Sequence, residues 1–303
     1  MHIQRGAWAE INLDAVAHNV QMAKANLKPT TKLCAVVKAD AYGHGAVRVA
    51  QEAARNGADF FAVALLQEGV KLREAGIETP ILVLGSMLPE VAEICVRYDI
   101  SHAVFDEERL YALNAAALKL HTKAKIHIKI DTGMHRIGVH VRDAGRFAKL
   151  AASLPGIYIE GVFSHFATAD ADDKQYAAYQ FERFQEALRL IEAEGVHIPI
   201  RHIANSAALT ELQEYQLDMV RQGITLYGLH PAHMIDCYKD FEPVMTVKTQ
   251  VAFVKTLPPG ETIGYGRTYT LTRPSVIATV PIGYADGVSR RLSNRGYMLV
   301  NGK

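Results

Sequence analysis

Cysteine is scarce in this sequence, with three in 303 residues, and none of the three stands in a recognisable motif. They are Cys34, Cys95 and Cys237, an odd number whose spacing matches no zinc-binding pattern. We therefore expect the thiols to be reduced, as is usual in a cytoplasmic protein. We also expect no bound metal.

An excess of charge of either sign is also missing. The 33 basic and 32 acidic residues leave a formal net charge of +1, and no run of five like charges occurs. A basic groove for nucleic acid or a charged surface for membranes is therefore not expected. Small molecules and other copies of the chain remain as partners.

The sequence has no long apolar stretch. Its first residues, MHIQRGAWAEINLD, lack the apolar core of a secretory signal. No uncharged apolar run approaches the roughly 18 residues that a membrane-spanning helix needs. We expect a soluble protein located in the cytoplasm.

What the sequence does contain is an alternation of short β-rich runs and longer helical stretches. Strand candidates lie at 33–37, 59–64, 81–84, 101–105, 125–130, 157–166, 200–204 and 219–228. Helical candidates separate them at 45–57, 67–76, 89–98, 107–120, 141–154, 175–195 and 206–215. Such alternation predicts parallel βαβ units, and eight of them predict an α/β fold, a (β/α)8 TIM-type barrel, over residues 13–240. A doubly wound open sheet is the competing architecture.

The texture of the sequence changes after residue 240. MTVKTQVAFVKTL, ETIGYGRTYTL, SVIATVPIGY and GYMLV are β-rich, with glycine and proline turns and no helical period. This predicts a second, all-β domain over 241–303. WAEINLD near the N-terminus reads as an isolated strand, so residues 1–12 are expected to join this domain.

The carboxyl ends of barrel strands are where active-site groups are expected. In AVVKADAYGHG, residues 35–45, Lys38 stands at such an end and is followed by a tyrosine and two glycines. Mainly basic, hydroxyl and amide groups stand at the other ends: Lys129, Asp131, Arg136, Ser164, His165, Asn205, Ser206, Arg221 and Gly223. These residues offer no obvious carboxylate pair for a retaining glycosidase and no cluster of metal ligands.

A lysine at a strand end among other cations suits imine chemistry. A free lysine titrates near 10.4, and burial or nearby cations lower that pKa and free the amine to attack a carbonyl. Pyridoxal phosphate offers such a carbonyl, and so does a keto or aldehyde substrate. In barrels a phosphate often lies at the loops after strands 7 and 8, which here hold Asn205-Ser206 and Arg221–Ile224.

At this point a resemblance becomes specific. AVVKADAYGHG resembles the signature of the alanine racemase family, pyridoxal-phosphate enzymes with a barrel and a β-domain. IKIDTGMHRIG, FSHFATAD, HIANSAA, MVRQGITLYG, IGYGRTYT and PIGYADG resemble that family too. They occur in the family's order and span nearly the whole chain.

The resemblance implies a reaction and its acid–base groups. Pyridoxal 5'-phosphate would be held by Lys38 as a Schiff base, and L- and D-alanine would be interconverted to supply D-alanine for peptidoglycan. Lys38 would be one of two bases, and Tyr265 from the β-domain of a partner subunit would be the other. The protein would then be a homodimer with shared active sites and a small amino acid as substrate.

The resemblance also implies supporting roles. Tyr42, Ser206 and the backbone of Gly223 and Ile224 would bind the phosphate. His165 and Asn205 would lie near the cofactor ring, and Arg221 would face the pyridine nitrogen. Arg136 would approach the phenolic oxygen and the substrate, Lys129 as a carbamate would hold Arg136, and Tyr284 would line the substrate entrance.

Ordinary structural interpretations stand beside these roles. Lys38 could be a surface lysine, His165 a core histidine and Lys129 a salt-bridge partner, while Arg136 and Arg221 could form structural ion pairs. Tyr269 is a second candidate close to Tyr265. At the level of function, the alternatives are a serine or broad-specificity racemase, a non-catalytic pyridoxal-phosphate-binding barrel and a Schiff-base aldolase.

Two features depart from the family pattern. His135 precedes Arg136 where the family usually has a small residue, often glycine. The chain stops at YMLVNGK, part-way through the β-domain as the family builds it. We therefore expect weakened dimerisation and low or absent turnover of this 303-residue chain.

Overall fold

The computed structural model describes residues 6–231 and 238–303. The chain forms two compact units, one of residues 12–244 and one that combines 1–11 with 245–303. Among the described residues, no helix has both the length and the apolar character needed to cross a bilayer.

The larger unit is a nearly closed ring of eight parallel strands, in the order β10-β2-β3-β4-β5-β6-β8-β9. They are β2 (Lys32–Val36), β3 (Phe60–Val63), β4 (Ile81–Val83), β5 (Ser101–Val104), β6 (Ala124–Asp131), β8 (Ile157–Phe163), β9 (Ile200–His202) and β10 (Met219–Gln222). Two backbone hydrogen bonds of 3.1 Å, from Asp218 N–H to Arg201 O and from Arg221 N–H to Ala204 O, link β9 to β10. The predicted barrel is therefore confirmed over the open sheet. A short strand, β7 (Val139–His140), pairs with the end of β6.

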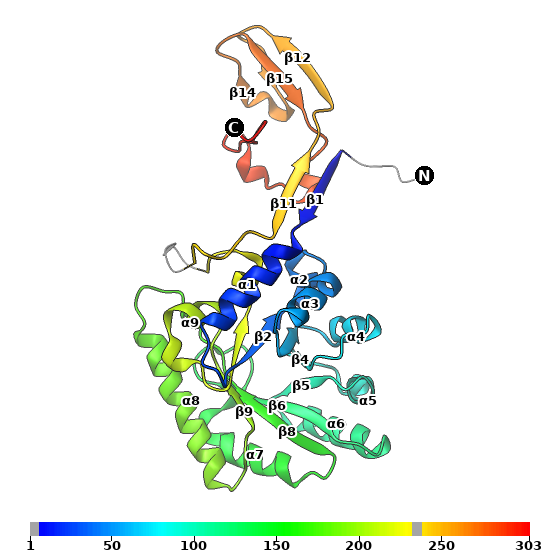
Figure 1. Cartoon of the computed structure of the whole chain (residues 1–303), viewed down its shortest axis with the longest axis vertical. Helices are drawn as coiled ribbons and strands as arrows, with labels where there is room; N and C mark the ends of the chain where they lie inside the picture. The colour runs from blue at the N-terminus through cyan, green and yellow to red at the C-terminus, as the bar shows by residue number, and fades with distance from the viewer. Residues whose placement is uncertain (1–5, 232–237) are drawn as a thin grey trace. The chain divides into compact units, whose positions relative to one another are not determined.

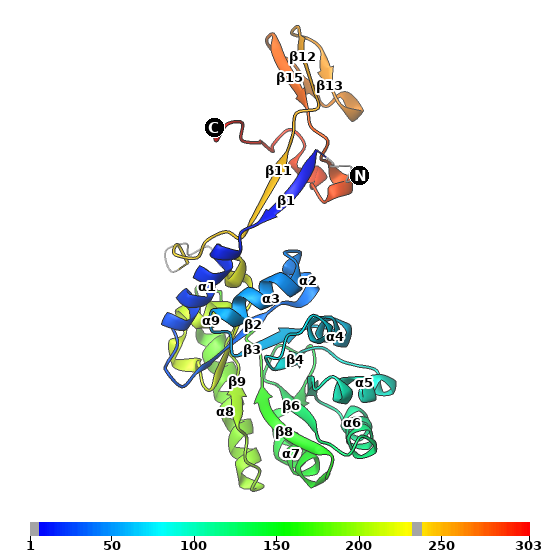
Figure 2. The ribbon, with the colours of Figure 1, turned by 45° about the vertical axis from the view of Figure 1, so that its right-hand side comes forward.

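Helices cover the outside of the ring (Figures 1 and 2). The α-helices of this unit are α1 (Leu13–Ala25), α2 (Lys38–Tyr42), α3 (Ala46–Arg55), α4 (Leu66–Glu74), α5 (Ala92–Arg97), α6 (Glu107–Lys119), α7 (Ala144–Ser153), α8 (Gln175–Ala193) and α9 (Ser206–Glu211). The short α2 and the start of α9 lie at the carboxyl ends of the strands instead. Inside the ring, alternate strand residues such as Cys34 with Val36 and Phe60 with Ala62 form one buried apolar cluster. This follows from the two-residue period of a strand, which sends every second side chain to the same face.

Helix α1 corrects the sequence-based interpretation of WAEINLD as one strand. The strand β1 (Ala7–Ile11) ends at Ile11, because Asn12 caps the helix that follows. The Asn12 side chain accepts hydrogen bonds from the N–H groups of Asp14 at 3.0 Å and Ala15 at 3.2 Å. Asparagine is among the residues preferred at that position, and the buried Val16 and Val20 give the helix its apolar face.

Two of the predicted strands, at 157–166 and 219–228, are shorter than expected. The candidate at 157–166 is a strand only to Phe163, and the candidate at 219–228 only to Gln222. Residues Ile224–Tyr227 form a 3-10 turn instead, which begins after Gly223. Both strands therefore end just before the loops that were expected to hold functional groups.

The smaller unit is built from antiparallel strand pairs. The N-terminal strand β1 pairs with β11 (Met245–Thr249), as predicted, and β12 (Phe253–Leu257) pairs with β15 (Ser275–Thr279). β13 (Thr262–Ile263) pairs with β14 (Tyr269–Thr270). No α-helix occurs in the described part of this unit. The expected strand at GYMLV is absent, since residues 297–301 find no described strand to pair with.

Candidate functional site

A hollow of about 210 Å³ lies at the carboxyl ends of the barrel strands. It is lined by Val36, Lys38, Tyr42, Leu84, His165, Asp170, Asn205, Ser206, Ala207, Arg221, Gly223, Ile224 and Pro231. The structure thus brings Lys38 together with all of the barrel residues that were expected to hold a phosphorylated cofactor. Asp170, Val36, Leu84, Ala207 and Pro231 also line the hollow, although the sequence assigned no site role to them.

Lys38 enters this hollow directly after the strand β2 and its following residue Val37. Its Nζ atom lies 5.8 Å from the centre of the Tyr42 ring. Within the described residues it forms no hydrogen bond or ion pair, so its amine is not committed to a structural partner. Burial lowers the pKa of Lys38, the positive charges of Arg136 and Arg221 lower it further, and Glu68 opposes the shift. A lysine that loses its proton more easily is a better nucleophile.

The backbone after Lys38 turns in the left-handed region. Ala39, Asp40, Ala41 and Tyr42 have φ angles between 52° and 55°, where a non-glycine residue costs about 1–2 kcal/mol. The Glu68 carboxylate accepts a hydrogen bond from Ala39 N–H at 2.6 Å, and Asp40 accepts one from Ala46 N–H at 3.1 Å. These two bonds, one from a distant helix and one within the turn, offset the strain and hold Tyr42 at the hollow.

A second group of donors surrounds Gly223. Ser206 Oγ accepts a hydrogen bond from Gly223 N–H at 2.8 Å. A Cβ atom on Gly223 would lie 3.5 Å from the Tyr42 hydroxyl and 3.7 Å from Ser206 Oγ, so these groups converge on one point. The N–H of Ile224 has no acceptor among the described residues. Hydroxyl and backbone N–H donors at the start of a helical turn are the groups that bind phosphate.

Asn205 is already engaged in a local bond. Its side chain caps the helix α9 by accepting from Ala208 N–H at 3.1 Å. The cap fixes the start of α9, and thereby the position of Ser206. Asn205 still lines the hollow.

Arg221 is 3% exposed and lies at the centre of a hydrogen-bond network. Its guanidinium donates to Ser164 O at 2.8 Å and Ile203 O at 3.0 Å, and lies 3.0 Å from His165 Nδ1 and 2.7 Å from His202 Nδ1. Burial lowers the pKa of Arg221 to about 10, so it remains a cation at neutral pH. Burial and the charge of Arg221 hold the pKa of His165 well below its usual value, and that imidazole is therefore neutral.

Lys129 and Arg136 do not line the hollow. Lys129 is 3% exposed. Its Nζ atom donates a hydrogen bond to Ile130 O at 2.7 Å and lies 3.5 Å from Ser164 Oγ. Burial, with the charges of Arg221 and Arg136, lowers the pKa of Lys129 to about 7. Arg136 is exposed, and no described residue forms a hydrogen bond or ion pair with it. Neither Lys129 nor Arg136 therefore forms, with any residue that the structure describes, the simple ion pair that is the alternative interpretation.

His135 has a φ of 54°, a region that glycine adopts without strain. Its backbone N–H and its Nδ1 atom each lie 3.0 Å from an oxygen of Asp131. The structure therefore gives a reason why a small residue, and glycine above all, would fit this position. Here the contact with Asp131 compensates for the strained backbone.

The remaining predicted residues belong to the smaller unit. Tyr265 is 95% and Tyr284 68% exposed, and both line a hollow of about 620 Å³ together with Tyr269. An aromatic side chain with so little packing in its own chain is free to contact something else.

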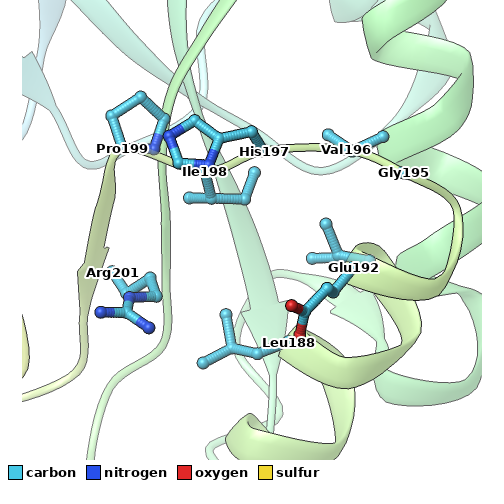
Figure 3. A pocket seen from close by; sticks show the side chains of 9 residues that line it. Leu188, Glu192, Gly195, Val196, His197, Ile198, Pro199 and Arg201 are labelled. Atoms are coloured by element: carbon cyan, nitrogen blue, oxygen red, sulfur yellow. The ribbon is translucent and has the colours of Figure 1, made fainter.

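A larger hollow, of about 480 Å³, lies between the end of α8 and the start of β9 (Figure 3). It is lined by Leu188, Ile191, Glu192, Gly195, Val196, His197, Ile198, Pro199 and Arg201. Arg201 is already paired with Asp218, with two contacts of 2.6 Å and 3.0 Å. This hollow is at the amino end of a barrel strand, where barrel enzymes do not place their active sites, so its volume does not make it the candidate site.

Sequence reasoning missed three polar residues inside the barrel: His127, Glu160 and His202. His127 stands two residues before Lys129 in KIHIKI, and the period of a strand places the two on the same face. That spacing was the available signal. Of the cysteines, Cys34 and Cys95 are buried and unpaired, burial raises the pKa of both thiols to about 12, and Cys237 lies outside the described residues.

Comparison with known proteins agrees with this geometry. Residues 11–231 match the model "Alanine racemase, N-terminal domain", and residues 244–303 match "Alanine racemase, C-terminal domain". Alanine racemases of Desulfovibrio desulfuricans and Halothermothrix orenii are each 46% identical to this chain; the matches cover 99% of it and 81% and 79% of those proteins.

Solved structures give the same result. Alanine racemase from a D-cycloserine-producing Streptomyces lavendulae matches with a TM-score of 0.93 at 36% identity, over 100% of this chain and 80% of that one. The Bacillus anthracis alanine racemase with bound L-Ala-P matches with a TM-score of 0.91 at 38% identity, over 100% and 79%. The family models cover both units, and the chain therefore belongs to the alanine racemase family.

Proposed function

We propose that this chain interconverts L- and D-alanine with pyridoxal 5'-phosphate as cofactor. The observation that carries the proposal is the position of Lys38, whose uncommitted amine shares a hollow with the hydroxyls of Tyr42 and Ser206 and the backbone of Gly223 and Ile224. Family membership and the names of the relatives support the same activity.

The donor set fits this cofactor. When bound, pyridoxal phosphate supplies a carbonyl that reacts with amines and an electron sink that makes the Cα proton of an amino acid removable. Tyr42, Ser206, Gly223 and Ile224 would hold the phosphate, and Lys38 would hold the reactive end. His165 and Asn205 would flank the ring.

Arg221 would face the pyridine nitrogen. Its guanidinium donates hydrogen bonds but keeps its proton, since an arginine pKa lies above about 12 in water and is still about 10 here. It would therefore orient the ring without giving it a full positive charge.

A racemase must remove a proton from one face of Cα and return one to the other. We assign the first face to Lys38, whose lowered pKa favours the neutral amine. We assign the second to Tyr265 of a partner subunit. The exposure of Tyr265 supports this assignment, because no described residue of its own unit covers the ring.

Lys129 and Arg136 form a supporting pair in this proposal. The lowered pKa of Lys129 leaves a large share of neutral amine at pH 7 to 8, which is the form that can react with carbon dioxide. As a carbamate, Lys129 would give Arg136 an anionic partner, and Arg136 would then approach the cofactor's phenolic oxygen and the substrate. Tyr284 would line the entrance.

In the cell, such a homodimer would act in the cytoplasm and supply D-alanine for peptidoglycan. A serine or broad-specificity racemase is the alternative at the level of substrate. A pyridoxal-phosphate-binding barrel without turnover is the alternative at the level of function, but it has no use for the second unit and Tyr265.

The test has two steps. An absorbance band of a bound pyridoxal imine should form with the wild type and be lost in Lys38→Ala, with Lys28→Ala, an exposed lysine near the barrel, as a control. Exchange of the Cα proton for deuterium from both L- and D-alanine in the wild type, and loss of exchange from only one of the two enantiomers in Tyr265→Phe, would establish a two-base racemase. Cofactor binding at Lys38 without any exchange would favour the non-catalytic alternative, and faster exchange with serine would correct the substrate.

A further inference from the structure

A line of buried polar side chains crosses the interior of the barrel from Arg221. The Nδ1 atom of His202 lies 2.7 Å from Arg221, and the Nε2 atom of His202 lies 2.8 Å from Nδ1 of His127. On the far side of the second imidazole, His127 Nε2 lies 3.0 Å from the Glu160 carboxylate, which also accepts from Ser101 at 2.5 Å. Both histidines are 0% exposed.

The donors and acceptors in this line can be assigned in only one way. An arginine has donors and no acceptor, so His202 Nδ1 must accept from Arg221 and the proton of His202 must be on Nε2. That proton is donated to His127 Nδ1, and His127 then donates from Nε2 to Glu160. A proton on both nitrogens of His127 would face the N–H of His202, so both imidazoles are neutral while Glu160 is ionised.

This arrangement supplies the counter-charge that Arg221 otherwise lacks. Among the described residues, the guanidinium contacts carbonyl oxygens and imidazoles but no carboxylate. A buried cation without a compensating charge is strongly destabilising. Hydrogen bonds in a chain polarise one another. The negative charge of Glu160 therefore favours protons on the Nε2 atoms of His127 and His202, which leaves His202 Nδ1 as an acceptor for Arg221.

The backbone makes room for this line. His127 pairs with Gly161 on β8, and the register shifts between Ile126 and His127. A Cβ atom on Gly161 would lie 2.4 Å from His127 Nδ1, a distance that no real contact shows. A glycine and a bulge at this one position allow the imidazole to reach both of its partners.

We propose that Glu160 is a positioning residue for Arg221, acting through His127 and His202, whose tautomers Glu160 and Arg221 fix from the two ends of the line. Without the charge of Glu160, the two imidazoles can reverse their protons, and His202 would then point an N–H at Arg221. Arg221 would lose its acceptor and shift in the hollow. The effect on catalysis rests on the proposed function of Arg221, whereas the fixed tautomers do not.

The tautomers can be measured directly on the protein labelled with ¹⁵N-histidine, without cofactor. Signals of His127 and His202 are assigned by their loss in His127→Gln and His202→Gln. We expect both histidines to be neutral with the proton on Nε2 from pH 6 to 9. A proton on Nδ1, or a charged imidazole, in that range would overturn the proposal.

The near-isosteric variant Glu160→Gln then tests the role of the charge, with Ser101→Ala, which retains the carboxylate, as its control. We expect Glu160→Gln to disturb the His202 tautomer and to lower kcat about tenfold, with KM changed less than twofold. A loss of this size is typical in metalloenzymes when a residue that hydrogen-bonds to a metal-binding histidine is replaced. Ser101→Ala should leave both unchanged, and Glu160→Asp should restore the tautomer in part.

Two mixed results would overturn the proposal as well: a changed tautomer with unchanged kcat, or a reduced kcat with unchanged tautomers. If the wild type does not racemise alanine, the proposed function fails. The histidine tautomers in the wild type and in Glu160→Gln then test by themselves whether Glu160 acts on His127 and His202. Thermal unfolding of each variant shows whether it has folded.

Discussion

The carboxylate of Glu68 accepts a hydrogen bond from the backbone N–H of Ala39 at 2.6 Å, 29 residues away in the sequence. The other oxygen of the same carboxylate accepts from the N–H groups of Ala64 at 2.8 Å and Leu65 at 3.0 Å. One side chain therefore ties the start of α4 to the left-handed turn behind Lys38.

Replacing Glu68 by alanine should destabilise the protein and loosen Lys38. Three N–H groups lose their acceptor, and the turn loses the bond that offsets its strain, so we expect unfolding to become easier by about 1–3 kcal/mol. Cofactor retention should fall with it. Denaturant unfolding and the pyridoxal absorbance measure the two effects. Glu74→Ala, on the same helix, removes an exposed carboxylate and should stay within about 0.5 kcal/mol of wild type; equal effects of both would contradict this account.

Lys129 should take up carbon dioxide. Its pKa of about 7 makes the neutral amine available at mildly alkaline pH, unlike the pKa near 10.4 of a free lysine. With ¹³C-labelled bicarbonate we expect a carbamate resonance that disappears in Lys129→Gln and persists in Lys125→Gln, a lysine on the same strand. A spectrum without this resonance at pH 8 would refute the carbamate and leave Arg136 without the partner proposed for it.

The barrel could be predicted because its signals are local. Runs such as LCAVV and DFFAVA are short and β-branched or aromatic, and the helices after them end at glycines such as Gly57 and Gly76, both with positive φ. The strand ends then gave the positions of Lys38 and Arg221. The helix α1 was missed because WAEINLD alternates like a strand, and its cap at Asn12 was not weighed against that pattern.

The details of the site depend on contacts that only the closed barrel creates. The two alanines and the tyrosine of Ala-Asp-Ala-Tyr disfavour a left-handed backbone; Glu68, on another helix, holds the turn. His127 and His202 are 75 residues apart in the sequence and meet only when β8 lies between β6 and β9. Such pairs cannot be read from propensity or periodicity in one sequence.

Gly161→Ala tests how closely the strands surround His127. The added methyl would lie 2.4 Å from His127 Nδ1 and 2.7 Å from the carbonyl oxygen of Ile200, so either the ring or the strand must move. Overpacking of this kind costs about 1–3 kcal/mol, and the His127 ¹⁵N signals should shift. Gly283→Ala is the control, because no atom of a described residue lies within 4 Å of its Cβ position and its φ is −163°. An alanine tolerated equally at both positions would show that the packing is looser than described.

His135 and His121 form a matched pair of strained histidines. Both have a positive φ, 54° and 52°, and both are exposed, but only His135 contacts a carboxylate. Glycine at either position releases the strain, and we expect His121→Gly to stabilise the protein by up to about 1 kcal/mol. His135→Gly should gain less, because it also removes the imidazole from Asp131.

The pH dependence of that difference has a definite sign. Burial alone would raise the pKa of Asp131, but hydrogen bonds from the N–H groups of His135 and Gly133 and from the His135 imidazole lower it. A lowered carboxyl pKa contributes stability above the pKa of the unfolded state, and that stability is lost as the pH falls through the folded pKa. The deficit of His135→Gly relative to His121→Gly should therefore be full at pH 6 and shrink below pH 4. Unfolding curves of the two variants across this pH range measure the deficit. If the deficit did not change with pH, the contact between His135 and Asp131 would contribute nothing to stability.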